Sequence, residues 1–304
     1  FVQREVVFRE WCYGNNMAAD IASFKLHIVV PPLAYPSFLW NPHYFCGFPL
    51  FADVHYYNLF SPLTFLRLCL SHIFRISNLA SFNLTHILYF PLASFFMYLY
   101  ARSIGINREG AILGGIIFGI IRKFGGSSFL NVYLWLPIIL FFLEKDVSQR
   151  SIHWRYVIVT GIFYGIQFLG GFIQLSYYFS IFLIFYLLFR YLLRPKGESP
   201  GKYLLAYFLI FAIAIGISAI QFIPAYELAK QSARFYFRDY EIFLIEDYLN
   251  KDYLKGIIFF NPEARHAFVG IFPVFLALLP LFSKKKTKFY YFYLFTALFF
   301  IMMS

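Results

Sequence analysis

Two carboxylates near the start of the chain stand among aromatic residues and have the chemistry of a general base. Asp20 lies in "NNMAADIASFKLH" and Asp53 in "FPLFADVHYYNLF". Such a carboxylate can take the proton of an acceptor hydroxyl and so make its oxygen a better nucleophile, and its oxygens can also bind a divalent cation. Each residue also precedes a potential helix, where Asp is a favoured N-cap. The sequence leaves the catalytic and the capping roles open.

The stretch "LWNPHYFCGFPLFAD" at 39–53 combines turn formers with aromatic residues. Trp40 and Asn41 precede a proline, and Gly47 lies two residues before another, so tight turns are expected. His43 and His55 have side chains that bind phosphate or metal ions, although hydrogen bonding at a membrane interface explains them equally. We expect this segment to form an aromatic platform at an interface.

A third group consists of cations that lie against the general charge pattern described below. Lys230, Arg234 and Arg238 follow Glu227 with a spacing that keeps them close to one helical face. Arginine grips phosphate through two parallel hydrogen bonds. A solvated interfacial helix with internal ion pairs is the competing interpretation, as is snorkelling for isolated cations. The candidate phosphate ligands are Arg122, Lys123, Arg234, Arg238 and His266.

Composition places these residues in a polytopic membrane protein. The chain is 61% hydrophobic and 13% charged, against about 25% charged in an average soluble domain. Its net charge of +11 comes from short basic clusters between apolar runs, which is typical of cytoplasmic loops and not of a nucleic-acid surface. The histidines and cysteines lack metal-ligand spacing, so no metal site is predicted. A bridge between Cys12 and Cys46, with Cys69 left over, stays open.

Apolar runs along the chain predict an all-α membrane bundle of about eight visible transmembrane helices. The run at 59–74 contains Pro62 and Arg67, which favours an interfacial or re-entrant helix. The chain opens at Phe1 and stops after an apolar run, so we expect a piece of a longer protein. The eight predicted spans are 80–101, 110–121, 127–143, 156–170, 172–193, 203–224, 268–282 and 288–304.

The distribution of basic residues predicts which loops face the cytoplasm. "KKKTK" at 284–288 has four lysines and is expected to be cytoplasmic. Alternation along the chain then places three other short basic loops on the same side, at 102–109, 144–155 and 190–202. The opposite side receives a long first loop at 1–79, a short turn at 122–126 and a second loop at 225–267. Transmembrane helices are expected at 80–224 and 268–304. Both loops are therefore expected on the extracytoplasmic side of the membrane.

Small residues within the predicted spans indicate close helix packing. Gly115 and Gly119 in "GGIIFG", and Gly161 and Gly165 in "GIFYG", follow the small-xxx-small pattern. The intramembrane amides at Gln167, Gln174 and Gln221 are expected to form inter-helix hydrogen bonds. Motifs of P-loop, zinc-protease and serine-hydrolase chemistry are missing from the sequence.

The stretch at 39–53 resembles the first-loop signature of the bacterial YfhO-like membrane proteins. The resemblance continues in order over about 20–282 and includes "FFMYLYARSIGINREGAILGGIIFG", "WLPIILFFLEK", "LGGFIQLSYY", "QFIPAYELAKQSAR" and "FVGIFPVFLALLPL". The sequence departs at Phe172, where relatives often have His. This family is similar in layout to GT-C glycosyltransferases, which take a sugar from a polyprenyl-phosphate carrier on the outer face and hold an acidic residue in the first outer loop. By position, the resemblance implies Asp20 as that acid, with Asp53 second.

The resemblance implies an inverting sugar transfer to a cell-envelope acceptor, which could be a glycan, a teichoic acid or a protein. Asp20 or Asp53 would be the base, and the outer cations would neutralise the leaving phosphate. The sequence indicates no specific cofactor, and a divalent cation stays possible. The main alternative is a transporter or flippase of a lipid-linked or hydrophobic solute, for which central charges and repeated halves would be expected. A scaffold without activity is the third option.

Overall fold

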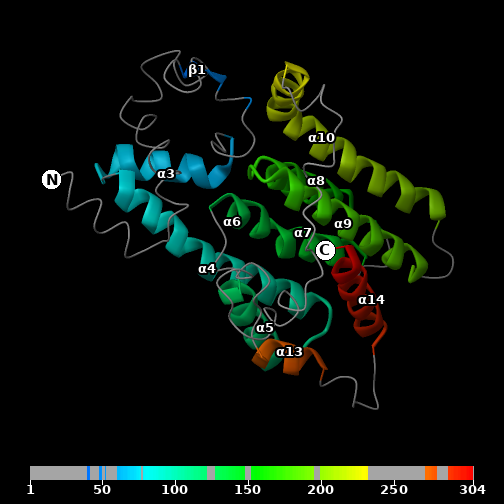
Figure 1. Ribbon diagram of the computed structural model, residues 1–304. Helices are drawn as coiled ribbons and strands as arrows, with labels where there is room; N and C mark the ends of the chain where they lie inside the picture. Colours follow the sequence, from blue (N-terminus) through cyan, green and yellow to red (C-terminus); the bar gives the residue numbers. More distant parts are fainter. Residues whose placement is uncertain are drawn as a thin grey trace.

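The computed structural model contains helices at all eight predicted apolar runs (Figure 1). The described residues are 40–41, 48–49, 52, 60–76, 78–121, 127–147, 152–194, 199–231, 271–278 and 287–303. The elements are β1 (Trp40–Asn41), β2 (Phe48–Pro49), α3 (Pro62–Ile73), α4 (Asn78–Ser103), α5 (Arg108–Ile121), α6 (Ser127–Tyr133), α7 (Trp135–Val147), α8 (Trp154–Phe168), α9 (Ile173–Leu192), α10 (Pro200–Gln231), α13 (Ile271–Leu278) and α14 (Lys288–Met303).

Three of the described helices are long and apolar enough to cross a membrane. They are α4 from Asn83 to Ser103, α9 over its full length, and α10. The helices at the other predicted spans have 7 to 16 residues within their described bounds, whereas a span needs about 20. The all-helical membrane character is therefore confirmed for these three helices, and the full set of eight spans stays a prediction.

Proline chemistry explains where one predicted span divides. The run at 127–143 forms α6 and α7, which are separated at Leu134. Pro137 has no N–H to donate to the carbonyl of Tyr133, and its ring crowds that oxygen. The first helix consequently ends at Tyr133. In α10, by contrast, the helix continues past Pro224 and ends at Gln231, inside the segment predicted as the second loop.

The glycine patterns lie at two close helix contacts, as predicted. A Cβ at Gly161 would lie 2.9 Å from the Cβ of Ile213, and one at Gly165 would lie 2.7 Å from that of Ile217. Both contacts join α8 to α10 with the same sequence separation, so these two helices run parallel. Gly115 brings α5 against α4 in the same way, because an added Cβ would lie 2.6 Å from the carbonyl oxygen of Ser94.

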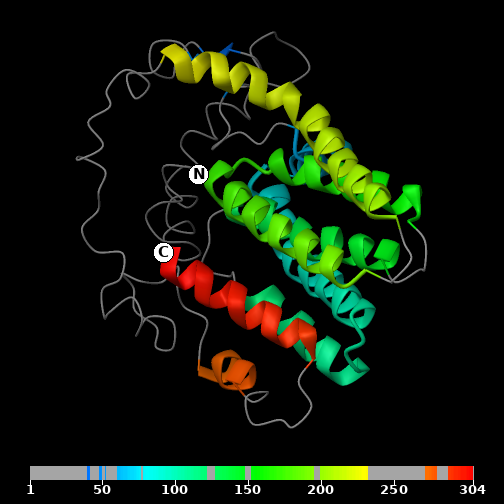
Figure 2. The ribbon, with the colours of Figure 1, turned by 90° about the vertical axis from the view of Figure 1, so that its right-hand side faces the viewer.

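Aromatic side chains connect α14 to α9, which lie beside each other in Figure 2. The ring of Phe292 stacks on Phe189 with centroids 4.5 Å apart, and Phe299 meets Phe185 edge to face at 5.0 Å. Large rings bridge two helices across a wider gap than small residues do. The bundle therefore combines glycine-lined contacts at α8–α10 with an aromatic layer between α9 and α14.

Candidate functional site

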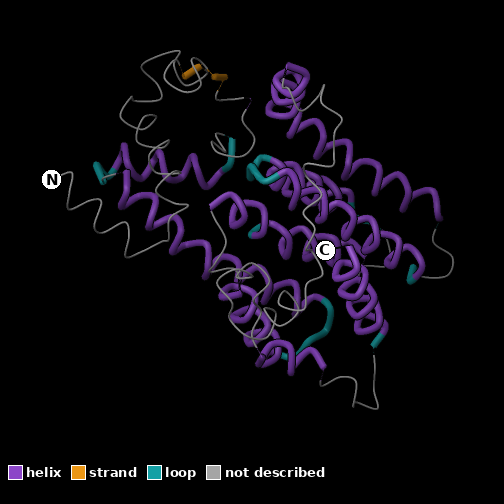
Figure 3. The backbone as a smooth tube through the Cα atoms, viewed as in Figure 1, coloured by secondary structure: helices purple, strands orange, loops and turns teal. Residues whose placement is uncertain are grey.

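Most residues of the sequence-predicted site lie outside the described part of the chain. Trp40 and Asn41 are described and form β1. Their backbone pairs with β2 in antiparallel register, Trp40 with Pro49 and Asn41 with Phe48 (Figure 3). Ten others lie outside the described residues: Asp20, His43, Gly47, Asp53, His55, Arg122, Lys123, Arg234, Arg238 and His266.

β1 and β2 form a small antiparallel pair in the segment before Asp53. The chain reverses direction between the two strands, as the turn formers in the sequence predict. Ala52, the residue directly before Asp53, is only 4% exposed. This one described residue is therefore packed against the protein, and Asp53 itself lies outside the described residues.

A polar group lies near the end of the bundle at which α4 and α6 begin. The hydroxyl of Tyr89 on α4 donates a hydrogen bond to Oδ1 of Asn131 on α6. His86, one turn before Tyr89, places its ring at the edge of the Tyr89 ring with centroids 5.7 Å apart. His86, Tyr89 and Asn131 are all buried. The group therefore orders the junction of α4 and α6 below the predicted outer face.

Arg67 brings a positive charge to this group from α3. Its guanidinium interacts electrostatically with Tyr89. The side chain is half-buried, so its charge is partly removed from water. A cation inside an apolar helix is a candidate ligand for a phosphate group.

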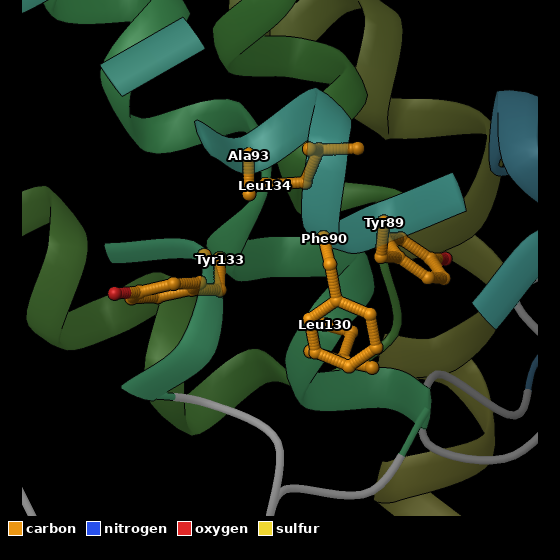
Figure 4. A pocket seen from close by; sticks show the side chains of 7 residues that line it. Tyr89, Phe90, Ala93, Leu130, Tyr133 and Leu134 are labelled. Atoms are coloured by element: carbon orange, nitrogen blue, oxygen red, sulfur yellow. The ribbon is translucent and has the colours of Figure 1, made fainter. Parts of the chain in front are cut away.

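The cavity beside Tyr89 is too small to hold a sugar. It lies between α4, α5 and α6, and Figure 4 shows Tyr89, Phe90 and Leu130 around it. Its volume is about 10 Å³, which is the space that a single water needs. The lining is apolar.

A second polar group is buried at the opposite end of the bundle. Nε of Arg190 on α9 lies 3.2 Å from Oε1 of Glu144 on α7. The hydroxyl of Tyr186 donates to the same carboxylate oxygen at 2.5 Å. Tyr100 on α4 shares hydrogen bonds with Tyr186, at 3.1 Å, and with Tyr293 on α14. We call these five residues the Glu144 cluster.

The Glu144 cluster joins four helices. Glu144 is 3% exposed and Arg190 12% exposed, so both charges are largely removed from water. The guanidinium of Arg190 also lies 5.5 Å from the centre of the Phe289 ring. Every charge in the cluster thus has a partner, which favours a role in holding the helices and not in catalysis. In the part of the chain that the structure describes, no three His, Cys, Asp or Glu side chains lie together as metal ligands.

The Glu144 cluster also marks the end of the bundle at which the predicted cytoplasmic loops begin. Tyr100, Glu144 and Arg190 each lie within three residues of the end of their helix, and Tyr293 is in the second turn of α14. The helix ends next to all four basic loops therefore meet. At the other end, Phe129 in α6 packs on Phe172, which precedes α9, with ring centroids 4.0 Å apart. The charge-based grouping of the loops agrees with this packing.

With this geometry in place, comparison with known proteins identifies the family. The family described as "Bacterial membrane protein YfhO" matches residues 33–304, which is most of the chain. The chain belongs to the YfhO family. It is 24% identical over 241 residues to "Uncharacterized protein YfhO" of Bacillus subtilis (strain 168), an alignment that covers 71% of this chain and 27% of the relative. The chain thus spans about a quarter of that relative's length. No solved structure matches the chain.

Sequence reasoning did not assign a role to Arg67 or to the Glu144–Arg190 pair. Arg67 had a signal, because a single charge inside an apolar run is unusual and calls for a partner. Glu144 and Arg190 each lie at the boundary of an apolar run, where loop charges are common. Their pairing depends on how α7 and α9 are arranged, which the YfhO family sequence pattern alone does not show.

Proposed function

We propose that the full-length protein transfers a sugar from a polyprenyl-phosphate donor to a cell-envelope acceptor on the extracytoplasmic face of the bacterial cytoplasmic membrane. Membership of a bacterial membrane protein family and three apolar helices of spanning length support the membrane location. The similarity in layout to GT-C glycosyltransferases supports the reaction class. The acceptor would be a glycan, a teichoic acid or a protein.

The orientation follows from the loops. Basic loops attach to the helix ends around the Glu144 cluster, and most acidic residues fall in 1–79 and 225–267. The positive-inside rule favours cytoplasmic placement of the basic end. The first and second loops would then be extracytoplasmic, where a lipid-linked sugar donor could reach Asp20 and Asp53.

The observation that carries the proposal for Asp53 is the burial of Ala52, the residue directly before it. The strands β1 and β2 pair in the segment before it, and α3 with its cation Arg67 begins within ten residues. A general base has to be held within hydrogen-bond reach of its proton, and a buried neighbouring residue supports that role. Asp20, which the resemblance ranks first, is the other candidate base.

The proposed reaction is an inverting displacement at the anomeric carbon. Asp53 or Asp20 takes the proton of the acceptor hydroxyl, whose oxygen forms the new bond to that carbon. The bond to the phosphate oxygen breaks, and the lipid phosphate leaves with the electron pair. Arg122, Lys123, Arg234, Arg238 and His266 are the proposed partners of that phosphate, with Arg67 as an addition from the structure.

The test is glycosyl transfer by membranes that contain the full-length protein and labelled polyprenyl-phosphate sugars. Asp20→Asn and Asp53→Asn are compared singly and together, with Glu10→Gln as a control in the same predicted loop. We expect one Asn variant to abolish transfer and Glu10→Gln to retain it. Full activity in the double variant would refute the proposed base. Absence of transfer with movement of the labelled lipid across the bilayer would favour the transporter.

A further inference from the structure

The exposed face of α3 is apolar. Phe65 is 66% exposed, Leu66 37% and Ile73 68%. Because successive residues of an α-helix are 100° apart, these three side chains lie on one face of the helix, within a sector of about 100°. A helix that is exposed to water presents polar side chains outward. The apolar exposed face of α3 is therefore not expected of a helix in a water-exposed loop.

The polar side chains at the start of α3 are buried. Thr64 is buried, and so is Ser61 directly before the helix. The guanidinium of Arg67 interacts with Tyr89 on α4. The polarity of α3 is thus reversed with respect to a helix on the surface of a soluble protein. Reversed polarity is expected where the surrounding solvent is hydrocarbon.

The position of α3 along α4 gives its depth. Leu63 and Tyr89 belong to the same buried core, and the two helices contact each other, as Figure 1 shows. Tyr89 lies six residues inside the apolar span that begins at Asn83, which is about 9 Å along the helix axis. Since the middle of α3 also interacts with Tyr89 through Arg67, α3 packs against α4 next to the apolar span.

The length of α3 excludes a full crossing. Its 12 residues extend about 18 Å, whereas the hydrocarbon core is about 30 Å thick. The chain then turns at Arg75, whose φ of 52° lies in the left-handed region, and enters α4. A helix that is immersed but too short to cross leaves the membrane on the side from which it entered.

We propose that α3 is a re-entrant helix immersed in one leaflet and that Phe65, Leu66 and Ile73 contact the acyl chains of phospholipids. The turn of the backbone at Arg75 returns the chain to the interface. Arg67 stays out of the lipid because it lies on the other side of α3, about 100° from Leu66 and farther from Phe65 and Ile73 around the helix. This arrangement holds whether or not the protein transfers sugars, so it stands independently of the proposed function.

The test uses single cysteines in the full-length protein, with all native cysteines replaced by serine, in phospholipid vesicles. The cysteines of Phe65→Cys and Ile73→Cys are labelled with bimane, and quenching of the bimane fluorescence by spin-labelled lipids in the vesicles is measured. Thr64→Cys is the protein-facing control, and Arg75→Cys is the water-facing control. We expect the lipids to quench the label strongly at Phe65→Cys and Ile73→Cys, and to quench it little at Thr64→Cys.

Reaction with a membrane-impermeant maleimide distinguishes the alternatives. Arg75→Cys is expected to react, whereas Phe65→Cys and Ile73→Cys are expected to resist. Rapid reaction at Phe65→Cys would place α3 in water and overturn the proposal. Lack of both quenching and reaction at Phe65→Cys and Ile73→Cys would show that another protein segment covers this face, which would also overturn it.

Discussion

Replacing Glu144 by Ala is expected to destabilise the bundle strongly, because Arg190 then loses its anionic partner. Glu144 accepts a hydrogen bond from Tyr186 and lies 3.2 Å from Nε of Arg190. Removing one member of a buried ion pair costs about 3–5 kcal/mol, since the remaining charge is left uncompensated.

The expected magnitude lies at the lower end of that range. Arg190 is 12% exposed and contacts the face of Phe289, so some hydration and a cation–π contact remain. We therefore expect a loss of about 3 kcal/mol in the free energy of unfolding, or roughly 100-fold in the equilibrium constant. Tyr186 would also lose its acceptor.

The assay is reversible unfolding of the full-length protein by SDS in mixed micelles, followed by tryptophan fluorescence. A double variant, Glu144→Leu with Arg190→Leu, separates the uncompensated charge from lost packing. Replacing both charges with apolar residues is expected to bring stability within about 1 kcal/mol of the parent. A loss below about 1 kcal/mol for Glu144→Ala, or additive losses in the double variant, would refute the reasoning.

Two further predictions concern single contacts and use the same unfolding assay. Gly165→Ala is expected to cost about 1–3 kcal/mol, because the new Cβ would lie 2.7 Å from that of Ile217. Gly216→Ala, whose Cβ would have no atom within 4 Å, is the matched control and is expected to be neutral or stabilising by up to about 1 kcal/mol; equal losses in both would contradict the packing argument. Tyr89→Phe is expected to cost about 1–3 kcal/mol, because it leaves the buried Asn131 oxygen without its donor. An unchanged midpoint would show that this hydrogen bond adds little.

Helix positions were predictable from the sequence because each depends on local composition. All eight apolar runs lie on helices. The break at Leu134 was missed, although Pro137 provides the physical cause three residues later. Conversely, Pro224 did not end α10, since one missing N–H removes one hydrogen bond from a helix with many others.

The sequence predicted that some helices pack closely, but it did not predict which helices contact each other. The glycine patterns predicted close approach, and the structure confirms it at Gly161 and Gly165. Which helix approaches them depends on the whole bundle and is not encoded in a local pattern. The same holds for Glu144 and Arg190. The catalytic roles of Asp20 and Asp53 lie outside the described residues and stay predictions.

The parallel contact between α8 and α10 constrains the order in which the protein assembles during synthesis. α9 separates these two helices in the chain, so the ribosome has to complete it before Ile213 and Ile217 can reach Gly161 and Gly165. Until then, the glycine-lined face of α8 stays open to lipid or to the insertion machinery. A nascent chain that stalls within α9 is therefore expected to expose this face to membrane quality-control proteases.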